Sequence, residues 1–520
     1  LTIIDRERTN EFIQTMLRQY EQGGLLPVWE LAANETNCMI GYQAVPVIVD
    51  ADMKGISDYD TEHAIDACIN SAMQDQFGLK WYREKGYIPS DKESESVSKT
   101  LEYAYDDWCI AQMAKALGRE KDFETFIRRA QNYKNLYDPE SGFMRAKSNE
   151  TWFSPFDPWE VNFNYTEANA WQYSFYVPQD ITGLMRLMGG SRKLEKRLDE
   201  LFSAEDKTTG RQQADITGLI GQYAHGNEPS HHMAYLYNYT GQPWKTQEIV
   251  RRIMDELYTS KPDGLCGNED CGQMSAWYVL SAMGFYPVTP GSNIYAIGSP
   301  VFDKVTLHLE NGREFVIEAR NQSSENKYVQ TASLNGEVYS KSYFTHEILM
   351  ETGFLTFEMG SKPSHNWGNA PDEQPVSEIT EFLITPVPFV DGTPQVFTGR
   401  EEIMLGNADP GAVIDFSLTL KNKDEIRDTY TYPILITESA TLQASAQSPG
   451  KTESYLIDAS FEKIPSGTKI TIKNPYANQY NAGGDMALID YQRGGTAFRT
   501  GRWQGYQDVD LEAVIHLRQS

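Results

Sequence analysis

Residues 96–117 read SVSKTLEYAYDDWCIAQMAKAL, and this stretch sets the fold class expected for the first half of the chain. Apolar residues recur in it at i, i+3 and i+4 spacing, the period of a helix with one buried face. The same spacing recurs in other segments, several of which end at glycines that stop helices. These segments are residues 6–20, 121–136, 181–188 and 242–257.

The arrangement predicted for residues 1–290 is a toroid of helical hairpins, a partial (α/α)6 barrel. Successive antiparallel helices collect their connecting loops at one end, and a ring of such hairpins encloses a broad, funnel-shaped pocket. The loops here are aromatic and polar, as in residues 151–159, TWFSPFDPW. The fold class expected is multidomain α plus β, with the helical toroid followed by β-sandwich modules.

After residue 290 the sequence changes to the period-2 alternation of half-buried strands. Residues 291–362 are predicted to be β-rich, with hairpin turns at Asn311-Gly312 and Asn335-Gly336. The polar residues 360–375 are predicted to be a linker.

Two further β units are predicted beyond this linker. Short strands at intervals of about 8 to 12 residues over residues 376–464 predict a small sandwich. Residues 465–520 are predicted to begin a third unit, because two or three strands are too few to close a sandwich.

Composition limits the partners. Lys and Arg number 46 against 73 Asp and Glu, and the net charge of -27 argues against nucleic acid and anionic membrane surfaces. No apolar run approaches the roughly 18 residues of a membrane span. Aromatic residues make up 12% of the chain, and their flat faces with polar edges suit sugars. A neutral glycan is the expected partner.

Three loops of the helical part carry carboxyl groups among aromatic and small residues. They are residues 165–173 (YTEANAWQY), 225–232 (HGNEPSHH) and 264–278 (GLCGNEDCGQMSAWY). In the third loop, Gly267 and Gly272 allow a tight turn and close approach to a ligand, and an apolar helix is predicted to follow. These loops are predicted to form a site.

Glu167 and Asp270 are the candidate catalytic pair. Tyr165 and Trp171 would desolvate the Glu167 carboxyl and raise its pKa, as a general acid requires, while Asp270 in its polar loop would stay ionised. Two such carboxyls cleave a glycosidic bond when one protonates the leaving oxygen and the other activates water. A helix cap or a surface ion pair is the alternative role for Glu167, and the residues leave both open.

Asn227 and Glu228 are the candidate metal ligands. Their hard oxygens beside Pro229 suit a calcium ion. The alternative is a helix N-cap before residues 231–236. Zinc bound by His231 and His232 is disfavoured, because adjacent histidines on a helix point in different directions.

Several longer motifs resemble the α-mannosidases of glycoside hydrolase family 92, over about residues 1–365. Besides the three loops, they are residues 26–30 (LPVWE), 34–41 (NETNCMIG), 95–108 (ESVSKTLEYAYDDW) and 281–288 (SAMGFYPV). The resemblance implies a calcium-dependent, exo-acting α-mannosidase that inverts anomeric configuration. It also implies an N-terminal β-sandwich packed on the helical toroid.

Site roles follow from this resemblance by position. It implies that Glu167 is the general acid, that Asp270 is the general base, and that Asn227 and Glu228 belong to the loop that holds calcium. The substrate-binding residues expected are Trp29, Glu30, Trp171, His225 and Glu269.

The chain departs from the family pattern at several positions. Many relatives have Asp at the position of Asn268, and the family often has His at the positions of Gln43 and Gln179. Relatives specific for α-1,2 linkages carry His-Glu where this chain has His225-Gly226, which favours α-1,3 or another linkage.

The ends of the chain also lead to expectations. The family's N-terminal sandwich and first toroid helices are expected to precede Leu1, and a chain without them is expected to be inactive alone. Residues 376–464 resemble the immunoglobulin-like C-terminal domain of chitobiase-type hexosaminidases. Residues 486–495 (MALIDYQRGG) and 498–506 (FRTGRWQGY) resemble the start of a discoidin-type sugar-binding sandwich.

The leading hypothesis is an exo-α-mannosidase that trims mannose-containing glycans such as N-glycans or mannan, outside a bacterial cell, at its surface or in its periplasm. The alternative is a non-catalytic glycan-binding or adhesion protein, which would have no need of a general acid. A toroid polysaccharide lyase is disfavoured, since the net charge of -27 would repel uronate substrates.

Overall fold

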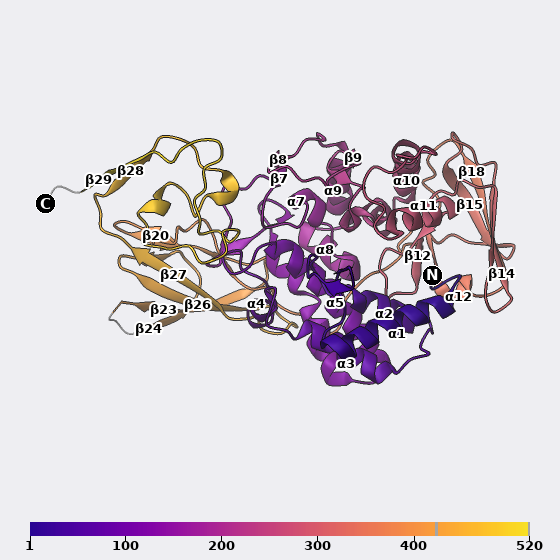
Figure 1. Ribbon diagram of the computed structural model, residues 1–520, viewed down its shortest axis with the longest axis horizontal. Coiled ribbons are helices and arrows are strands. Elements are labelled where there is room, and N and C mark those ends of the chain that lie inside the picture. The colour runs from indigo at the N-terminus through magenta and orange to yellow at the C-terminus, as the bar shows by residue number, and fades with distance from the viewer. Residues whose placement is uncertain (422–424, 518–520) are drawn as a thin grey trace.

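The computed structural model describes residues 1–421 and 425–517. Figure 1 shows a helical part in the middle of the molecule and β-sheets at both ends. The predicted combination of a helical domain with several β-sheet regions is therefore present. Closure of the helices into a toroid stays a prediction, as do the boundaries of the four predicted units.

The predicted helices are present, with ends that differ by a few residues. Residues 121–136 differ more, because α6 ends at Arg129 and the 3-10 helix η1 (Asn132–Leu136) follows it. The α-helices are α1 (Arg6–Gly23), α2 (Ala44–Met53), α3 (Thr61–Ala72), α4 (Leu79–Lys85), α5 (Ser96–Ala116), α6 (Glu120–Arg129), α7 (Ala170–Tyr173), α8 (Ile181–Met188), α9 (Ser191–Ser203), α10 (Pro243–Leu257), α11 (Gln273–Met283) and α12 (His346–Leu349).

Helix α5 lies inside the helical part and is buried around most of its circumference. The sequence pattern predicts one buried face, but α2, α3 and α6 all pack against α5 and bury its polar face as well. Three carboxylates, Glu102, Asp106 and Asp107, are buried as a result. Buried charges need partners, so the environment of these groups determines whether the helix is stable.

A buried ion pair joins α5 to α6. The guanidinium of Arg129 donates to both carboxylate oxygens of Asp107, at 2.8 Å and 3.0 Å. The hydroxyls of Tyr82 and Tyr42 also donate to this carboxylate. The Asp107 side chain is fully buried and that of Arg129 is 5% exposed, so neither charge has water as an alternative partner.

We expect Asp107→Asn to lower the free energy of unfolding by about 3–5 kcal/mol, because it leaves the Arg129 charge buried without a counter-ion. The matched control is Arg252→Ala, which removes the exposed i,i+4 pair with Glu256 and should cost about 0.5 kcal/mol or less. Urea denaturation measures both. Equal losses would contradict a structural role for the buried pair.

A five-stranded sheet follows the helical part, in the order β13-β14-β18-β15-β16. The turns predicted at Asn311-Gly312 and Asn335-Gly336 connect its antiparallel pairs β13/β14 and β15/β16. Of the predicted linker, residues 360–375, only Gly360 belongs to a strand, and residues 361–375 contain neither helix nor strand. The strands are β13 (Lys304–His308), β14 (Glu314–Arg320), β15 (Tyr328–Leu334), β16 (Glu337–Val338) and β18 (Gly353–Gly360).

The C-terminal region contains a second sheet, in the order β20-β27-β26-β23-β24. The pair β21/β25 accompanies it, and β28 pairs with β29 near the C-terminus. The strands are β20 (Val396–Phe397), β21 (Glu401–Ile403), β23 (Val413–Leu420), β24 (Glu425–Thr429), β25 (Ile434–Ile436), β26 (Ala440–Gln447), β27 (Ile457–Lys463), β28 (Lys469–Ile472) and β29 (Ala513–His516).

The C-terminal region and the helical part share a mixed sheet. Strand β19 (Phe389–Val390) pairs in parallel with β6 (Thr151–Trp152), which lies between α6 and α7 in the sequence. The Asn149 side chain adds two hydrogen bonds to the backbone of Ser460, at 2.8 Å and 3.0 Å. These contacts continue the hydrophobic core from the helices into the C-terminal strands.

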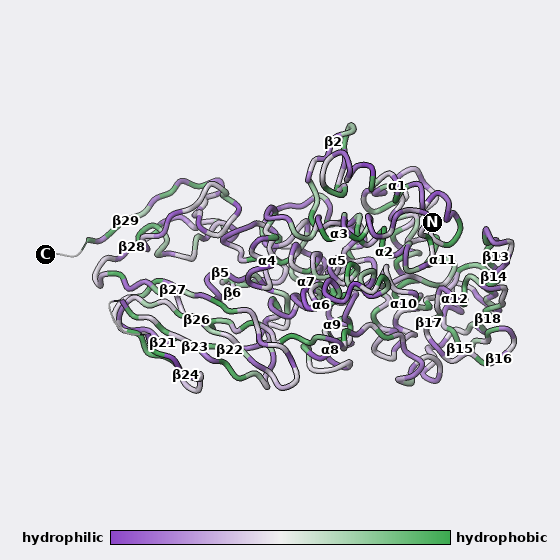
Figure 2. Tube along the Cα trace, turned by 90° about the horizontal axis from the view of Figure 1, so that it is seen from below, coloured by the Kyte–Doolittle hydropathy of each residue, from purple (hydrophilic) through white to green (hydrophobic). Residues whose placement is uncertain are grey.

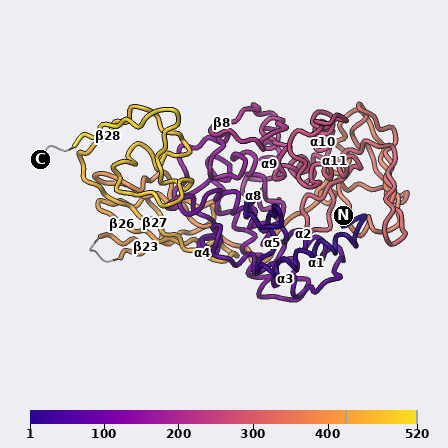
Figure 3. Tube along the Cα trace, in the orientation of Figure 1, coloured from indigo at the N-terminus to yellow at the C-terminus, as the bar shows by residue number. Residues whose placement is uncertain are grey.

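Residues 376–390, here called the crossing segment, connect the two ends of the molecule along the helical part (Figure 3). Side chains of the helical part accept hydrogen bonds from backbone N–H groups of the crossing segment. Asp180 accepts from Ile379 at 3.1 Å, and Asn135 accepts from Val387 at 2.9 Å. Among the residues that the structure describes, no helix is long and apolar enough to cross a membrane.

Candidate active site

The three predicted loops meet. Glu167 precedes α7, Glu228 begins the 3-10 helix η3 (Glu228–Ser230), and Asp270 precedes α11. The Asn227 amide donates to the Glu167 carboxylate at 3.4 Å and to the Glu167 carbonyl at 3.5 Å. The Asp270 carboxyl lies close enough to Glu228 to contribute to the raised pKa of that residue. The structure therefore brings together Glu167, Asn227, Glu228 and Asp270.

The backbone at three acidic residues of this cluster is in the left-handed region. The φ angles are 59° at Glu95, 49° at Glu167 and 53° at Asp270. A non-glycine residue in this conformation costs on the order of 1–3 kcal/mol, and such residues concentrate at functional sites. The recurrence of this conformation at three neighbouring carboxyl groups supports a functional role for the cluster.

The conformation of Glu167 is fixed by the residues that follow it. Asn169 and Gln172 form a capping box at the start of α7. Each side chain accepts a hydrogen bond from the backbone N–H group of the other residue. The Asn169 amide also donates to Gln222 at 2.8 Å. Asn169 thus caps α7, and Glu167 forms no ion pair among the described residues. The cap and ion-pair alternatives for Glu167 are therefore absent from the structure.

The environment of Glu167 suits a proton donor. Burial raises the pKa of its half-buried carboxyl, and the nearby charges of Asp215, Glu95 and Asp270 add to the effect, while the Asn227 hydrogen bond opposes it. The sequence predicts this direction from aromatic desolvation. The structure adds repulsion between carboxylates as a second cause.

The pKa of Glu228 is raised more strongly than that of Glu167. Burial, followed by the hydrogen bond and the charge of Asp270, raises the pKa of Glu228 to about 7. The Asn227 side chain makes no capping hydrogen bond at the start of η3 and contacts Glu167 instead. The N-cap alternative for Asn227 is therefore absent.

The loop that carries Asp270 is fixed by its neighbours. Glu269 accepts hydrogen bonds from the backbone N–H groups of Gly272 and Ser275 at the start of α11. Hydrogen bonds from Ser275, chiefly from its side chain, lower the pKa of Glu269. Glu269 thus holds the loop, whatever it contributes to sugar binding. Asn268 donates to Asp215 at 3.4 Å and brings that carboxylate to the loop.

Sequence reasoning missed Asp215 and Glu95 as members of this cluster. Asp215 lies in an irregular polar segment with no motif around it. Glu95 stands at the start of the family-like segment 95–108 but has no distinguishing neighbours in the sequence. Its backbone N–H donates to the Phe163 carbonyl at 2.6 Å, a tertiary contact that no local pattern reveals.

Two expected sugar-binding residues lie in the core. His225 is fully buried, and its ring nitrogens contact the hydroxyls of Tyr223 and Tyr258 at 2.7 Å and 2.6 Å. Burial, assisted by His231, lowers the pKa of His225 to about 2. Trp171 is 4% exposed and packs edge-on against Phe143.

Trp29 and Glu30 lie elsewhere, in the hairpin of β1 (Glu30–Leu31) and β2 (Asn34–Glu35), which projects from the molecule in Figure 2. Glu35 fixes this hairpin by accepting the backbone N–H groups of residues 28, 29 and 37. Trp29 is 43% exposed. Among the described residues, no hydrogen bond or ion pair joins the Trp29 or Glu30 side chain to the acidic cluster.

The donor set is chemically suited to a hard cation. Within the described ranges, no group of three or more His, Cys, Asp or Glu side chains is arranged to hold a metal ion. Calcium also takes amide and main-chain oxygens, and Asn227 and Glu228 offer such atoms beside two further carboxyls. A cation would reduce the repulsion that raises the pKa values of Glu167 and Glu228.

A further carboxyl, that of Glu102, is buried between Gln43 and Tyr173, whose side chains donate to it. Burial raises the pKa of Glu102 to about 7, although these hydrogen bonds lower it. In the unfolded chain its pKa would be near 4.5. The folded state therefore binds a proton more tightly than the unfolded state, and Glu102 makes the protein less stable as the pH rises from about 4.5 to 7.

We expect Glu102→Gln to remove this part of the pH dependence. The free energy of unfolding of the variant relative to the parent should rise by on the order of 2–3 kcal/mol between pH 4.5 and pH 8. Denaturant unfolding at several pH values measures the difference, and any constant packing cost cancels. A pH-independent difference would show that Glu102 titrates normally in the fold.

Comparison with known proteins places this site in context. The catalytic-domain model of glycosyl hydrolase family 92 matches residues 1–361. A family 92 α-mannosidase of Bacteroides thetaiotaomicron, solved in complex with mannoimidazole, superposes with a TM-score of 0.69. It is 43% identical, and the match covers 72% of this chain and 51% of that one.

Two further relatives are also similar to most of this chain. A family 92 inverting mannosidase of the same bacterium has a TM-score of 0.67 and 41% identity, over 72% of this chain and 53% of that one. An uncharacterized secreted glycosidase of Arthroderma benhamiae is 29% identical over 406 residues, which are 70% of this chain and 50% of that protein. The chain thus spans about half the length of the relatives it matches.

Proposed function

The chain belongs to glycosyl hydrolase family 92, and from this membership we propose that it forms part of an exo-acting, inverting α-mannosidase that is assisted by calcium. The observation that carries the proposal is the convergence of Glu167 and Asp270 in one acidic cluster, with the pKa of Glu167 raised. The names of the solved relatives, an α-mannosidase and an inverting mannosidase, support the substrate class.

Glu167 acts as the general acid in this proposal. Its raised pKa keeps a proton available near neutral pH, and the proton passes to the glycosidic oxygen as the bond to the leaving group breaks. The left-handed backbone and the adjacent capping box hold the carboxyl in one orientation. Pre-organisation of this kind reduces the entropy lost on reaching the transition state.

Asp270 acts as the general base and removes a proton from the water that attacks the anomeric carbon. An inverting enzyme needs this water on the face of the sugar opposite the leaving group. Glu269 holds the loop through the start of α11, which fixes the position of Asp270. Asp215, which Asn268 contacts, adds negative charge near the developing oxocarbenium ion.

Asn227 and Glu228 would hold the calcium ion, which would supply charge neutralisation and orient hydroxyl groups of the sugar. The proposal rests on their oxygen donors and on the unbalanced negative charge around them. Glu228, whose pKa is raised by burial and by the neighbouring Asp270, would also lie between the cation and the base.

We also propose an extracellular, cell-surface or periplasmic location in a bacterium. The support is one relative described as a secreted glycosidase, together with the resemblance of residues 376–464 and 465–520 to chitobiase-type and discoidin-type modules. Such modules would tether the enzyme to a glycan or a surface. A mannose-containing glycan is the proposed partner, with a linkage other than α-1,2 favoured by His225-Gly226.

Glu167→Gln should remove turnover of mannosides with poor leaving groups far more than turnover of aryl mannosides. Only the poor leaving groups need a proton, so general-acid catalysis worth about 10²–10⁴-fold should be lost on them. The assay compares kcat/KM of the parent protein and the variant for a mannobiose and a nitrophenyl mannoside. Glu120→Gln, on the exposed surface of α6, is the matched control.

Equal losses on both substrates would exclude Glu167 as the acid. Retained glycan binding with no turnover by the parent protein would instead favour the alternative of a non-catalytic glycan-binding protein.

Chelation tests the cation. We expect EDTA to abolish activity and added calcium to restore it, while Asn227→Ala and Glu228→Gln should raise the calcium concentration that gives half-maximal activity. Carboxylate and amide oxygens are calcium ligands, so their loss weakens binding directly. Unchanged rates in EDTA would exclude a calcium requirement.

A further inference from the structure

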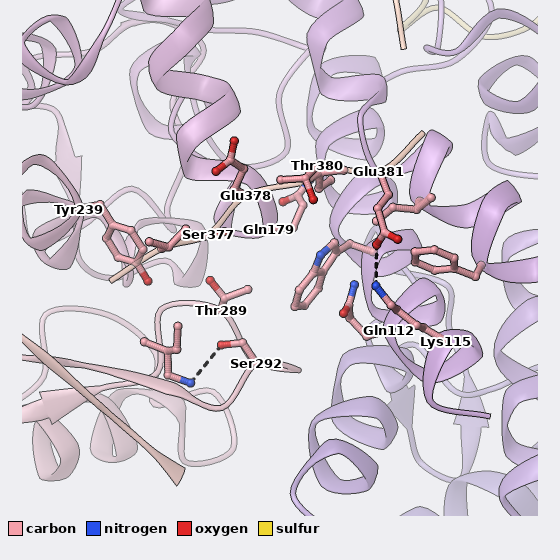
Figure 4. A pocket seen from close by; sticks show the side chains of 16 residues that line it. Gln112, Lys115, Gln179, Tyr239, Thr289, Ser292, Ser377, Glu378, Thr380 and Glu381 are labelled. Carbon is pink, nitrogen blue, oxygen red and sulfur yellow. Dashed lines mark hydrogen bonds and ion pairs between the residues drawn. The ribbon is translucent and has the colours of Figure 1, made fainter. Parts of the chain in front are cut away.

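A cavity of about 260 Å³ lies outside the acidic cluster and shares no residue with it (Figure 4). Its walls come from α5, α6, the loop before β12 (Ile294–Ile297) and residues 376–381 of the crossing segment. Pockets for drug-sized ligands begin at roughly 300 Å³. This cavity is smaller, so its volume limits the ligand to one sugar ring or a molecule of similar size.

The charged groups around this cavity are already paired. Lys115 Nζ lies 2.6 Å from Glu381 Oε2, a contact that joins α5 to the crossing segment (Figure 4). Glu378 forms an ion pair with Arg186 of α8. A charged ligand would have to break one of these pairs, so the cavity favours a neutral molecule.

Three neutral polar side chains that line the cavity have a hydrogen-bonding atom without a partner in the described part of the protein. Gln179 is 1% exposed, and its amide nitrogen donates to the Ala130 carbonyl at 3.2 Å, while its amide oxygen has no hydrogen bond. Among the described residues, the side chains of Gln112 and Thr380 also make no hydrogen bond. The amide oxygen of Gln179 has almost no accessible surface, so Gln112 and Thr380 are the groups of this set that a ligand can reach.

Aromatic and hydroxyl groups complete the lining. Trp108 and Phe123 contribute rings, and the half-buried Trp108 offers a surface for C–H groups. Thr289 and Ser377 both donate to the Pro178 carbonyl, at 2.8 Å and 2.6 Å, and so retain oxygen lone pairs that can accept from a ligand.

We propose that this cavity is a second binding site, for a neutral polyol of monosaccharide size. The ligand's hydroxyls bond Gln112 and Thr380 while its apolar face lies on Trp108. Because residues 376–381 form one wall, occupancy also stabilises the attachment of the crossing segment to the helical part. The proposal goes beyond the proposed catalytic function and does not depend on it.

Hydrogen exchange measured by mass spectrometry, with and without D-mannose, tests the proposal peptide by peptide. At a free sugar concentration of about ten times Kd, exchange through local opening should slow by up to about tenfold in peptides covering residues 289–294 and 376–381. D-glucuronate, an anionic sugar of similar size, should give no protection there. Protection in the loops of Glu167, Asn227 and Asp270 is read separately and bears on the catalytic proposal alone.

Two variants make the test specific. Thr380→Trp fills the cavity, and Gln112→Leu removes an amide that makes no hydrogen bond within the described protein, so neither should unfold the chain. Both should lose mannose-induced protection at residues 376–381 while keeping the parent melting temperature. No protection of these peptides in the parent protein, or protection that persists in Thr380→Trp, would overturn the proposal.

Discussion

The burial of several carboxylates close together is the constraint that the loops of the helical part must accommodate. Burial raises the pKa of Glu167 and of Glu228, and the charge of Asp270 adds to both effects. Asp215 and Glu95 add negative charge near Glu167. Such a cluster is unfavourable by itself, because like charges in a poorly solvated region cannot all ionise. The fold must therefore supply stabilisation elsewhere, and the cluster has a ready use for protons and for a cation.

That stabilisation comes from rigid attachment of each loop. The capping box of Asn169 and Gln172 follows Glu167, and Glu269 fixes the start of α11 directly beside Asp270. Behind the loops, α5 is buried and joined to α6 through Asp107 and Arg129. These anchors are satisfied polar contacts, so the strained, like-charged residues can persist without opening the core.

Local patterns in the sequence predict local features well. Helical periodicity predicts α5, and Asn-Gly pairs predict the hairpin turns. Carboxyls among aromatic and small residues select the loops of Glu167 and Asp270, whose catalytic roles stay a prediction. Features that depend on distant partners are not predictable in this way. Asp215 reaches the site through Asn268, and His225 is buried by Tyr223 and Tyr258, contacts set by tertiary packing. The buried carboxylates of α5 belong to the same class, since an amphipathic pattern places them in solvent.

The attachment of the C-terminal region to the helical part also depends on distant partners. Its strands are predictable from alternation, but β19 pairs with β6, and Asp180 and Asn135 hold the crossing segment. If a segment attached through backbone hydrogen bonds to buried side chains separates, each side chain that stays buried without its partner costs about 1–3 kcal/mol. The cavity under residues 376–381 is thus enclosed by two parts of the molecule that must stay together. A ligand bound there would add its own contacts to both.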